Sequence, residues 1–101
     1  MQFLVIAYDG HDPAALERRL AVRERHLALA DQMTRVGQML YATAILDEAD
    51  KMIGSMLVVN FPSRTELDAW LGVEPYMTGN VWQRVHVQRC RVAPQFAATS
   101  S

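Results

Sequence analysis

The chain has 101 residues, of which 50% are hydrophobic and 21% are charged, a composition typical of one small globular domain and not of a disordered segment. Ten basic and eleven acidic side chains give a net charge of −1, which favours neither nucleic acid nor an anionic membrane as a partner. Cys90 is the single cysteine, so an internal disulfide is excluded and a reducing, cytoplasmic location is expected.

The first predicted element is a strand in the apolar run Phe3 to Tyr8, which Asp9 and Gly10 end as turn residues. A strand that is apolar on both faces needs both faces covered. The run lacks the basic start of a signal peptide and is too short to span a bilayer. We therefore expect a buried strand, and neither a secretory leader nor a membrane partner.

A long helix is predicted next, from Asp12 and Pro13 to about Val36. Asp can cap a helix, and Pro suits the first helical position because its missing N–H would have no partner there. Gly37 then supplies the left-handed residue that commonly ends a helix.

Two strands follow the helix. The segment Met39 to Leu46 is rich in strand-forming residues, and Ile53 to Phe61 is a second apolar run. Only the short polar segment Asp47 to Lys51 separates them. This spacing predicts an antiparallel hairpin.

A short helix and a last strand complete the predicted domain. Ser63 and Glu66 have the spacing of a capping box, which predicts a helix that begins there and runs through Leu71. Residues 72–80 are rich in turn formers, and Val81 to Val92 alternates in the manner of a strand. We expect one domain over residues 1–94 and a C-terminal tail over residues 95–101.

The element order is β-α-β-β-α-β, which predicts an α+β ferredoxin-like fold. Its two helices would cover one face of a four-stranded sheet. The other face would carry alternate residues of apolar strands and needs a cover that the chain does not supply. A second copy of the chain is the simplest cover, so a homodimer is expected.

The long helix carries an anomaly. On a helical wheel, Arg19, Arg23 and His26 fall within a wide apolar arc that also holds Leu20 and Leu27. Their spacing of i, i+4 and i+7 places the three ionisable side chains on one stripe. Burying such groups is costly unless they are paired or line a cavity, so the stripe indicates a functional site. A structural alternative stays open, in which the arginines extend to water and the histidine is a satisfied core residue.

Other candidate residues carry weaker signals. The chain's two remaining histidines, His11 and His86, lie far from His26 in the sequence, so no metal site is predicted. Cys90 has no neighbouring cysteine or helix start to activate its thiol. No phosphate-binding loop, nucleophile motif or cofactor motif is present, and no cofactor is expected.

The chain resembles the YciI-related family. The resemblance is carried by RLAVRERHLA (Arg19 to Ala28), by Gly37 with the hairpin after it, and by EPYMTGNVWQRVHV (Glu74 to Val87). It implies a dimeric α+β barrel with an active-site histidine, matching His26, near an acidic residue, matching Glu74. The family usually has Asp before Pro-Tyr, and the longer Glu74 leaves open whether a fixed histidine–carboxylate pair forms.

Together these features predict a cofactor-independent lyase or isomerase that acts on a small anionic carbonyl or lactone compound. A carboxylate that accepts from one imidazole nitrogen would make the other a base for a carbon-bound proton. The resemblance extends this to dehydrochlorination in aromatic catabolism. Arg19 or Arg23 would hold the substrate's negative charge, and Tyr76 would donate a hydrogen bond.

Two alternatives remain open. The second interpretation is a non-catalytic module, in which the same pocket binds a small molecule or the dimer assists a partner enzyme. A third, weaker interpretation is a cofactorless monooxygenase with an aromatic pocket formed by Tyr41, Phe61, Trp70 and Trp82. Aromatic residues at strand spacing more often belong to the core.

Overall fold

The computed structural model describes residues 1–97. It has one antiparallel sheet in the spatial order β2-β3-β1-β4, formed by strands β1 (Gln2–Asp9), β2 (Met39–Leu46), β3 (Met52–Asn60) and β4 (Trp82–Cys90). The helices are α1 (Ala15–Arg35), α2 (Arg64–Leu71), α3 (Pro75–Thr78) and α4 (Pro94–Ala97). The predicted α+β ferredoxin-like fold is confirmed.

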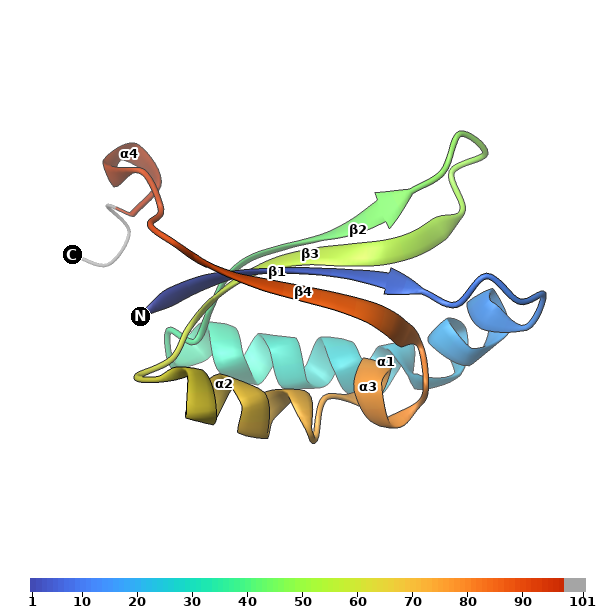
Figure 1. The fold of residues 1–101 in the computed structure, drawn as a ribbon, viewed down its shortest axis with the longest axis horizontal. Coiled ribbons are helices and arrows are strands. Elements are labelled where there is room, and N and C mark those ends of the chain that lie inside the picture. The colour runs from blue at the N-terminus through green and yellow to red at the C-terminus, as the bar shows by residue number, and fades with distance from the viewer. Residues whose placement is uncertain (98–101) are drawn as a thin grey trace.

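Three of the helices, α1, α2 and α3, lie on the same side of the sheet (Figure 1). On β1 the side chains of Phe3, Val5 and Ala7 point to this side and are buried, because side chains alternate along a strand. Leu57 and Val59 of β3 lie opposite them in the ladder and are also buried. The hydrophobic core is therefore the layer between the sheet and these helices.

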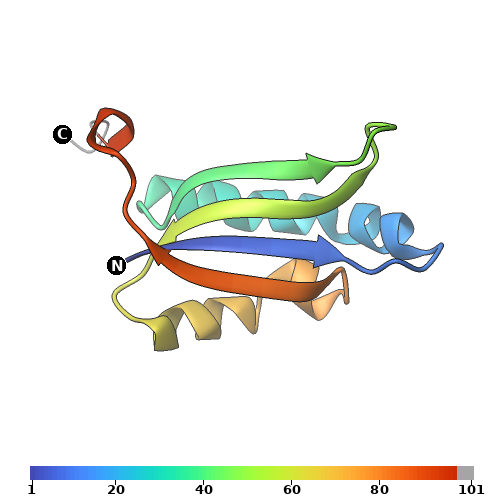
Figure 2. The same cartoon turned by 45° about the horizontal axis from the view of Figure 1, so that its top comes forward.

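On the other face of the sheet, residues 1–97 place no helical layer (Figure 2). Its centre is apolar, because Leu4 pairs with Val58 and Ile6 pairs with Met56 in the ladder. Tyr41 of the edge strand β2 pairs with Val58 on this face and is 63% exposed. Within the described residues, this apolar face has no cover.

The ends of α1 match the sequence prediction only in part. The helix begins at Ala15, after Pro13, and its N-cap position, Ala14, makes no side-chain cap. Asp12 instead pairs with Arg18 at 2.7 Å and accepts a hydrogen bond from the Ala14 N–H. These bonds hold Asp12 in the preceding turn. At the other end Gly37 has φ 79°, as predicted for the left-handed residue after a helix.

Two short helices, α3 and α4, were not predicted. Each has four residues, which is too short to give a helical period in the sequence. The segment that forms α4 projects from the sheet on the side away from α1 (Figure 1). Residues 98–101 of the predicted tail lie outside the described part of the chain. No helix within residues 1–97 is long and apolar enough to cross a membrane.

Candidate functional site

His26 and Glu74 meet in the layer between α1 and the sheet, although 48 residues separate them in the sequence. Both side chains are buried, and the Nδ1 atom of His26 is hydrogen-bonded to Oε1 of Glu74. The same carboxylate oxygen accepts the backbone N–H of Tyr76 at 3.1 Å. Glu74 thus caps helix α3 and holds the imidazole at once, and its longer side chain does reach the histidine.

Tyr76 forms an aromatic wall of this site. Its ring stacks on the His26 ring with a centroid distance of 3.9 Å and an interplanar angle of 16°. Trp82 meets the His26 ring edge-on at 5.9 Å. Burial raises the pKa of Tyr76 above its ordinary value of 10.0, although Arg19 and Arg23 act in the opposite direction. The phenol therefore keeps its proton at neutral pH and can donate a hydrogen bond.

Arg19 is 3% exposed and is held by two strands. Its Nη1 atom donates to both carboxylate oxygens of Asp9, at 3.0 and 3.1 Å, and its Nη2 atom donates to Oγ of Ser55 at 3.0 Å. The indole N–H of Trp82 donates to the same hydroxyl at 3.1 Å. The Arg19 guanidinium carbon lies 4.6 Å from the centroid of the Tyr76 ring.

Sequence reasoning missed this network, because it interpreted Asp9 as a turn residue and gave Ser55 no role. Asp9 is in fact buried at the end of β1, where burial raises its pKa and the charge of Arg19 opposes the rise. The sequence held one signal for Asp9 and Ser55. Each is a polar residue on the helix-facing side of an otherwise apolar strand. Its partner on the helix could not be read from that signal.

The helical wheel correctly placed the three ionisable residues on one stripe of α1, but two of the apolar residues that it placed beside them are exposed. Arg19 and His26 are buried, which answers for Arg19 a question that the sequence left open, but Leu20 and Leu27 are 52% and 45% exposed. Arg23 is exposed too, and it makes no ion pair with any acidic side chain within residues 1–97. The sheet ends at β2, so no element within residues 1–97 covers the flank of α1 that carries these three residues.

A cavity of about 140 Å³ opens at this flank, between α1 and the edge strand β2. His26, Tyr76 and both arginines of the stripe line it. On the strand side it is lined by Ala42 and Ala44, which point to the helices because they pair with Leu57 and Ser55. Their small side chains leave room for a ligand at the edge of the sheet.

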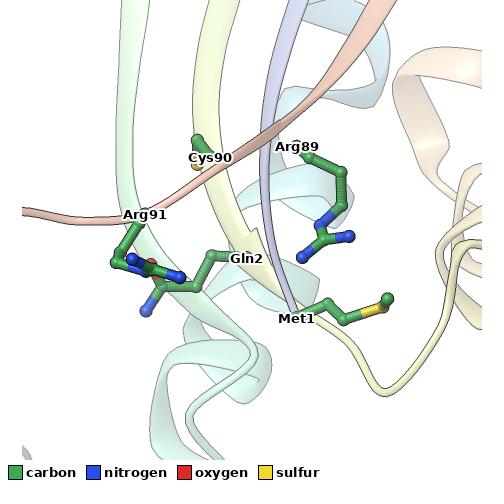
Figure 3. A pocket seen from close by; sticks show the side chains of 5 residues that line it. All are labelled: Met1, Gln2, Arg89, Cys90 and Arg91. Atoms are coloured by element: carbon green, nitrogen blue, oxygen red, sulfur yellow. The ribbon is translucent and has the colours of Figure 1, made fainter.

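A larger cavity of about 440 Å³ lies where β1 begins and β4 ends. Figure 3 shows Arg89 and Arg91 extending on either side of β1 there, beside Met1 and Gln2. The cavity has no acid–base pair among its lining residues. We therefore place the candidate site in the smaller cavity, where the buried ionisable residues meet.

The remaining sequence candidates lie elsewhere. His86 pairs with Ile6 on the uncovered face of the sheet. His11 lies in the loop after β1 and contacts Arg84 of β4. Within residues 1–97, no group of three or more metal-ligating side chains gathers. The four aromatic residues of the monooxygenase interpretation do not line the 140 Å³ cavity. Phe61 and Trp70 stack in the core instead, and Tyr41 lies on the opposite face.

Comparison with known proteins agrees with this fold. A solved structure of 5-chloro-2-hydroxyhydroquinone dehydrochlorinase from Burkholderia phenoliruptrix, in complex with 2,5-dihydroxybenzoquinone, superposes with a TM-score of 0.79 at 20% identity, over 94% of this chain and 98% of that one. A dimeric ferredoxin-like protein of unknown function from Jannaschia has a TM-score of 0.54 at 11% identity, over 90% and 98% of the two chains. These similarities show a shared fold.

Sequence comparison gives the family. Protein YciI of Escherichia coli is 31% identical in an alignment of 94 residues that covers 87% of this chain and 94% of that protein. The family model of the YCII-related domain matches residues 1–91. The chain therefore belongs to the family of YCII-related domains.

Proposed function

We propose that this protein is a cofactor-independent lyase or isomerase in which His26 removes a proton from carbon. The observation that carries the proposal is the buried hydrogen bond between His26 Nδ1 and Glu74. A carboxylate at Nδ1 holds the proton on that nitrogen and leaves Nε2 with its lone pair. The imidazole is then a fixed base at the wall of a cavity.

The proposed step balances without any co-reactant. Nε2 of His26 takes a proton from a carbon next to a carbonyl, and the C–H electron pair moves toward the carbonyl oxygen to give an enolate. If the next carbon carries chlorine, the electrons return and chloride leaves, so the net change is loss of HCl. If it carries no leaving group, protonation at another carbon completes an isomerisation.

Two other side chains fit this chemistry. Tyr76 lines the cavity and keeps its proton because burial raises its pKa, so it is a suitable hydrogen-bond donor to the enolate oxygen. Arg23 lines the same cavity and is a suitable partner for a carboxylate or phenolate of the substrate. The dehydrochlorinase of the same fold, solved with a six-membered-ring ligand, supports a small ring compound as substrate.

We also propose that the protein works as a homodimer through the uncovered face of its sheet. Four strands of about eight residues span roughly 19 by 26 Å, or about 500 Å². Two such faces give roughly 1,000 Å² in total, which is near the lower limit for a specific interface. The apolar centre at Leu4, Ile6 and Val58 supports a protein contact there. The dimeric ferredoxin-like protein of this fold supports self-association.

The test measures turnover of chlorinated hydroquinones and lactones, with chloride release and absorbance as the readouts. His26→Ala should lower the rate at least about 100-fold, as expected for the loss of a general base. His11→Ala is the matched control, because it removes an exposed histidine that lies outside the cavity. An unchanged rate in His26→Ala would overturn the proposal. Binding of such compounds without turnover by the wild type would favour the binding-module alternative.

A further inference from the structure

The two arginines of the α1 stripe differ in their surroundings. Arg19 is 3% exposed, and its two terminal nitrogens are bound to Asp9 and Ser55. Arg23, one turn later, is exposed at the cavity and has no acidic partner within residues 1–97. Within the described part of the chain, Asp9 thus balances the positive charge of Arg19, whereas no carboxylate pairs with Arg23.

The Tyr76 ring lies against both ends of this stripe. Arg19 and His26 are seven residues apart on α1, which is a rise of about 10.5 Å along the helix. The Tyr76 ring centroid is 4.6 Å from the Arg19 guanidinium carbon and 3.9 Å from the His26 ring centroid. The ring therefore lies between the two side chains along the helix.

We propose that Asp9, Arg19 and Ser55 form a buried frame that holds the Tyr76 ring against His26, and that Arg23 alone recognises the charge of the ligand. Arg19 is then a positioning residue and not a ligand of the substrate. The frame fixes Arg19 from β1 through Asp9 and from β3 through Ser55. Trp82 joins it from β4 through the same Ser55 hydroxyl.

The substrate class follows from this division, and this part of the inference rests on the proposed function. One unbalanced guanidinium at the cavity favours a ligand with a single negative charge. A cavity of about 150 Å³ in another protein holds one benzene ring, and the cavity here is about 140 Å³. The ligand is therefore a monoanion with one ring, with its charged group at Arg23 and its ring toward Tyr76 and His26.

Benzoate and benzamide are the probes, because they have the same shape and differ in charge. NMR titrations of the wild type should give a dissociation constant about tenfold lower for benzoate than for benzamide, because benzoate makes a charge-assisted hydrogen bond. Arg23→Gln should remove that preference and leave the His26 ring-proton shifts of the free protein unchanged. Arg19→Gln should weaken both probes by the same factor and keep the preference.

Ser55→Ala keeps the ion pair between Arg19 and Asp9. It tests the frame if Arg19→Gln does not fold. It should move the His26 ring-proton shifts, because the Tyr76 ring current depends on the frame. Ser63→Ala, which removes the α2 cap hydroxyl, is the matched serine control and should leave these shifts in place.

Three results would overturn the proposal: equal or absent binding of the two probes by the wild type, loss of the preference in Arg19→Gln or Ser55→Ala, or unchanged His26 shifts in Ser55→Ala. These measurements use no turnover. A failed activity assay would refute the proposed reaction and leave the frame and the role of Arg23 standing.

Discussion

Replacement of Glu74 gives a graded prediction, because its carboxylate serves two buried donors. In Glu74→Ala the His26 Nδ1 and the Tyr76 N–H both lose their acceptor. Each unsatisfied buried donor costs about 1–3 kcal/mol. We therefore expect the free energy of unfolding to fall by about 2–6 kcal/mol, which is a large part of the roughly 5–15 kcal/mol of a small domain.

Two further variants separate the charge from the hydrogen bonds. Glu74→Gln keeps an oxygen acceptor at nearly the same place and should cost only about 1–2 kcal/mol, the difference between charged and neutral hydrogen bonds. Glu24→Ala on the exposed face of α1 is the matched control and should stay within about 0.5 kcal/mol of the wild type.

The assay is urea unfolding followed by tryptophan fluorescence, with the free energy taken by linear extrapolation. Heating gives an independent measure, since 1 kcal/mol corresponds to about 4–8 °C in a domain of this size. A Glu74→Ala protein whose free energy of unfolding lies within about 1 kcal/mol of the wild type would contradict this prediction. It would mean that the carboxylate does not satisfy these two donors.

Three other outcomes are expected. Burial raises the pKa of Tyr76 above 10.0, because the folded state favours the neutral phenol. The stabilisation that this phenol contributes is therefore present below pH 10 and is lost as the pH rises through the raised pKa. Urea midpoints should therefore fall above pH 10 in the wild type and fall less in Tyr76→Phe. Gly37→Ala should lower the free energy of unfolding by about 1–2 kcal/mol, because φ of Gly37 is 79°. Gly72→Ala should not, because φ of Gly72 is −65°. Calorimetry compares the two variants, and equal melting temperatures for both would contradict this prediction. In the proposed homodimer, Ile6→Asp should give a monomer by light scattering, whereas the exposed Val73→Asp should leave the dimer intact. A dimer that persists in Ile6→Asp would place the interface elsewhere.

The sheet and the long helix could be predicted from the sequence because their signals are local. Apolar runs of strand length, the polar turn at Asp47 and the glycine at position 37 each act within a few residues. The start of α1 was misplaced because Asp12 binds Arg18 and the Ala14 N–H, so Asp12 and Pro13 stay in the preceding turn. The residue type alone does not show which of several nearby partners a side chain binds.

The candidate site was predictable as an anomaly but not as an arrangement. Three ionisable residues on one apolar stripe indicated a site near His26, and the family resemblance indicated Glu74. The partners of Arg19 lie 10 and 36 residues away on two different strands. Only the sheet register brings Asp9 and Ser55 to the same helix turn, so the opposite environments of Arg19 and Arg23 could not be predicted from their spacing.

In the proposed mechanism, Glu74 holds the proton of His26 on Nδ1 and leaves Nε2 free. Long-range ¹H–¹⁵N NMR of the His26 ring, recorded at a pH where the ring is neutral, identifies the tautomer from the two nitrogen shifts. We expect a protonated Nδ1 and an unprotonated Nε2 in the wild type, and a mixture of tautomers in Glu74→Ala. A wild-type ring with its proton on Nε2 would contradict the account, because no lone pair would then face away from Glu74.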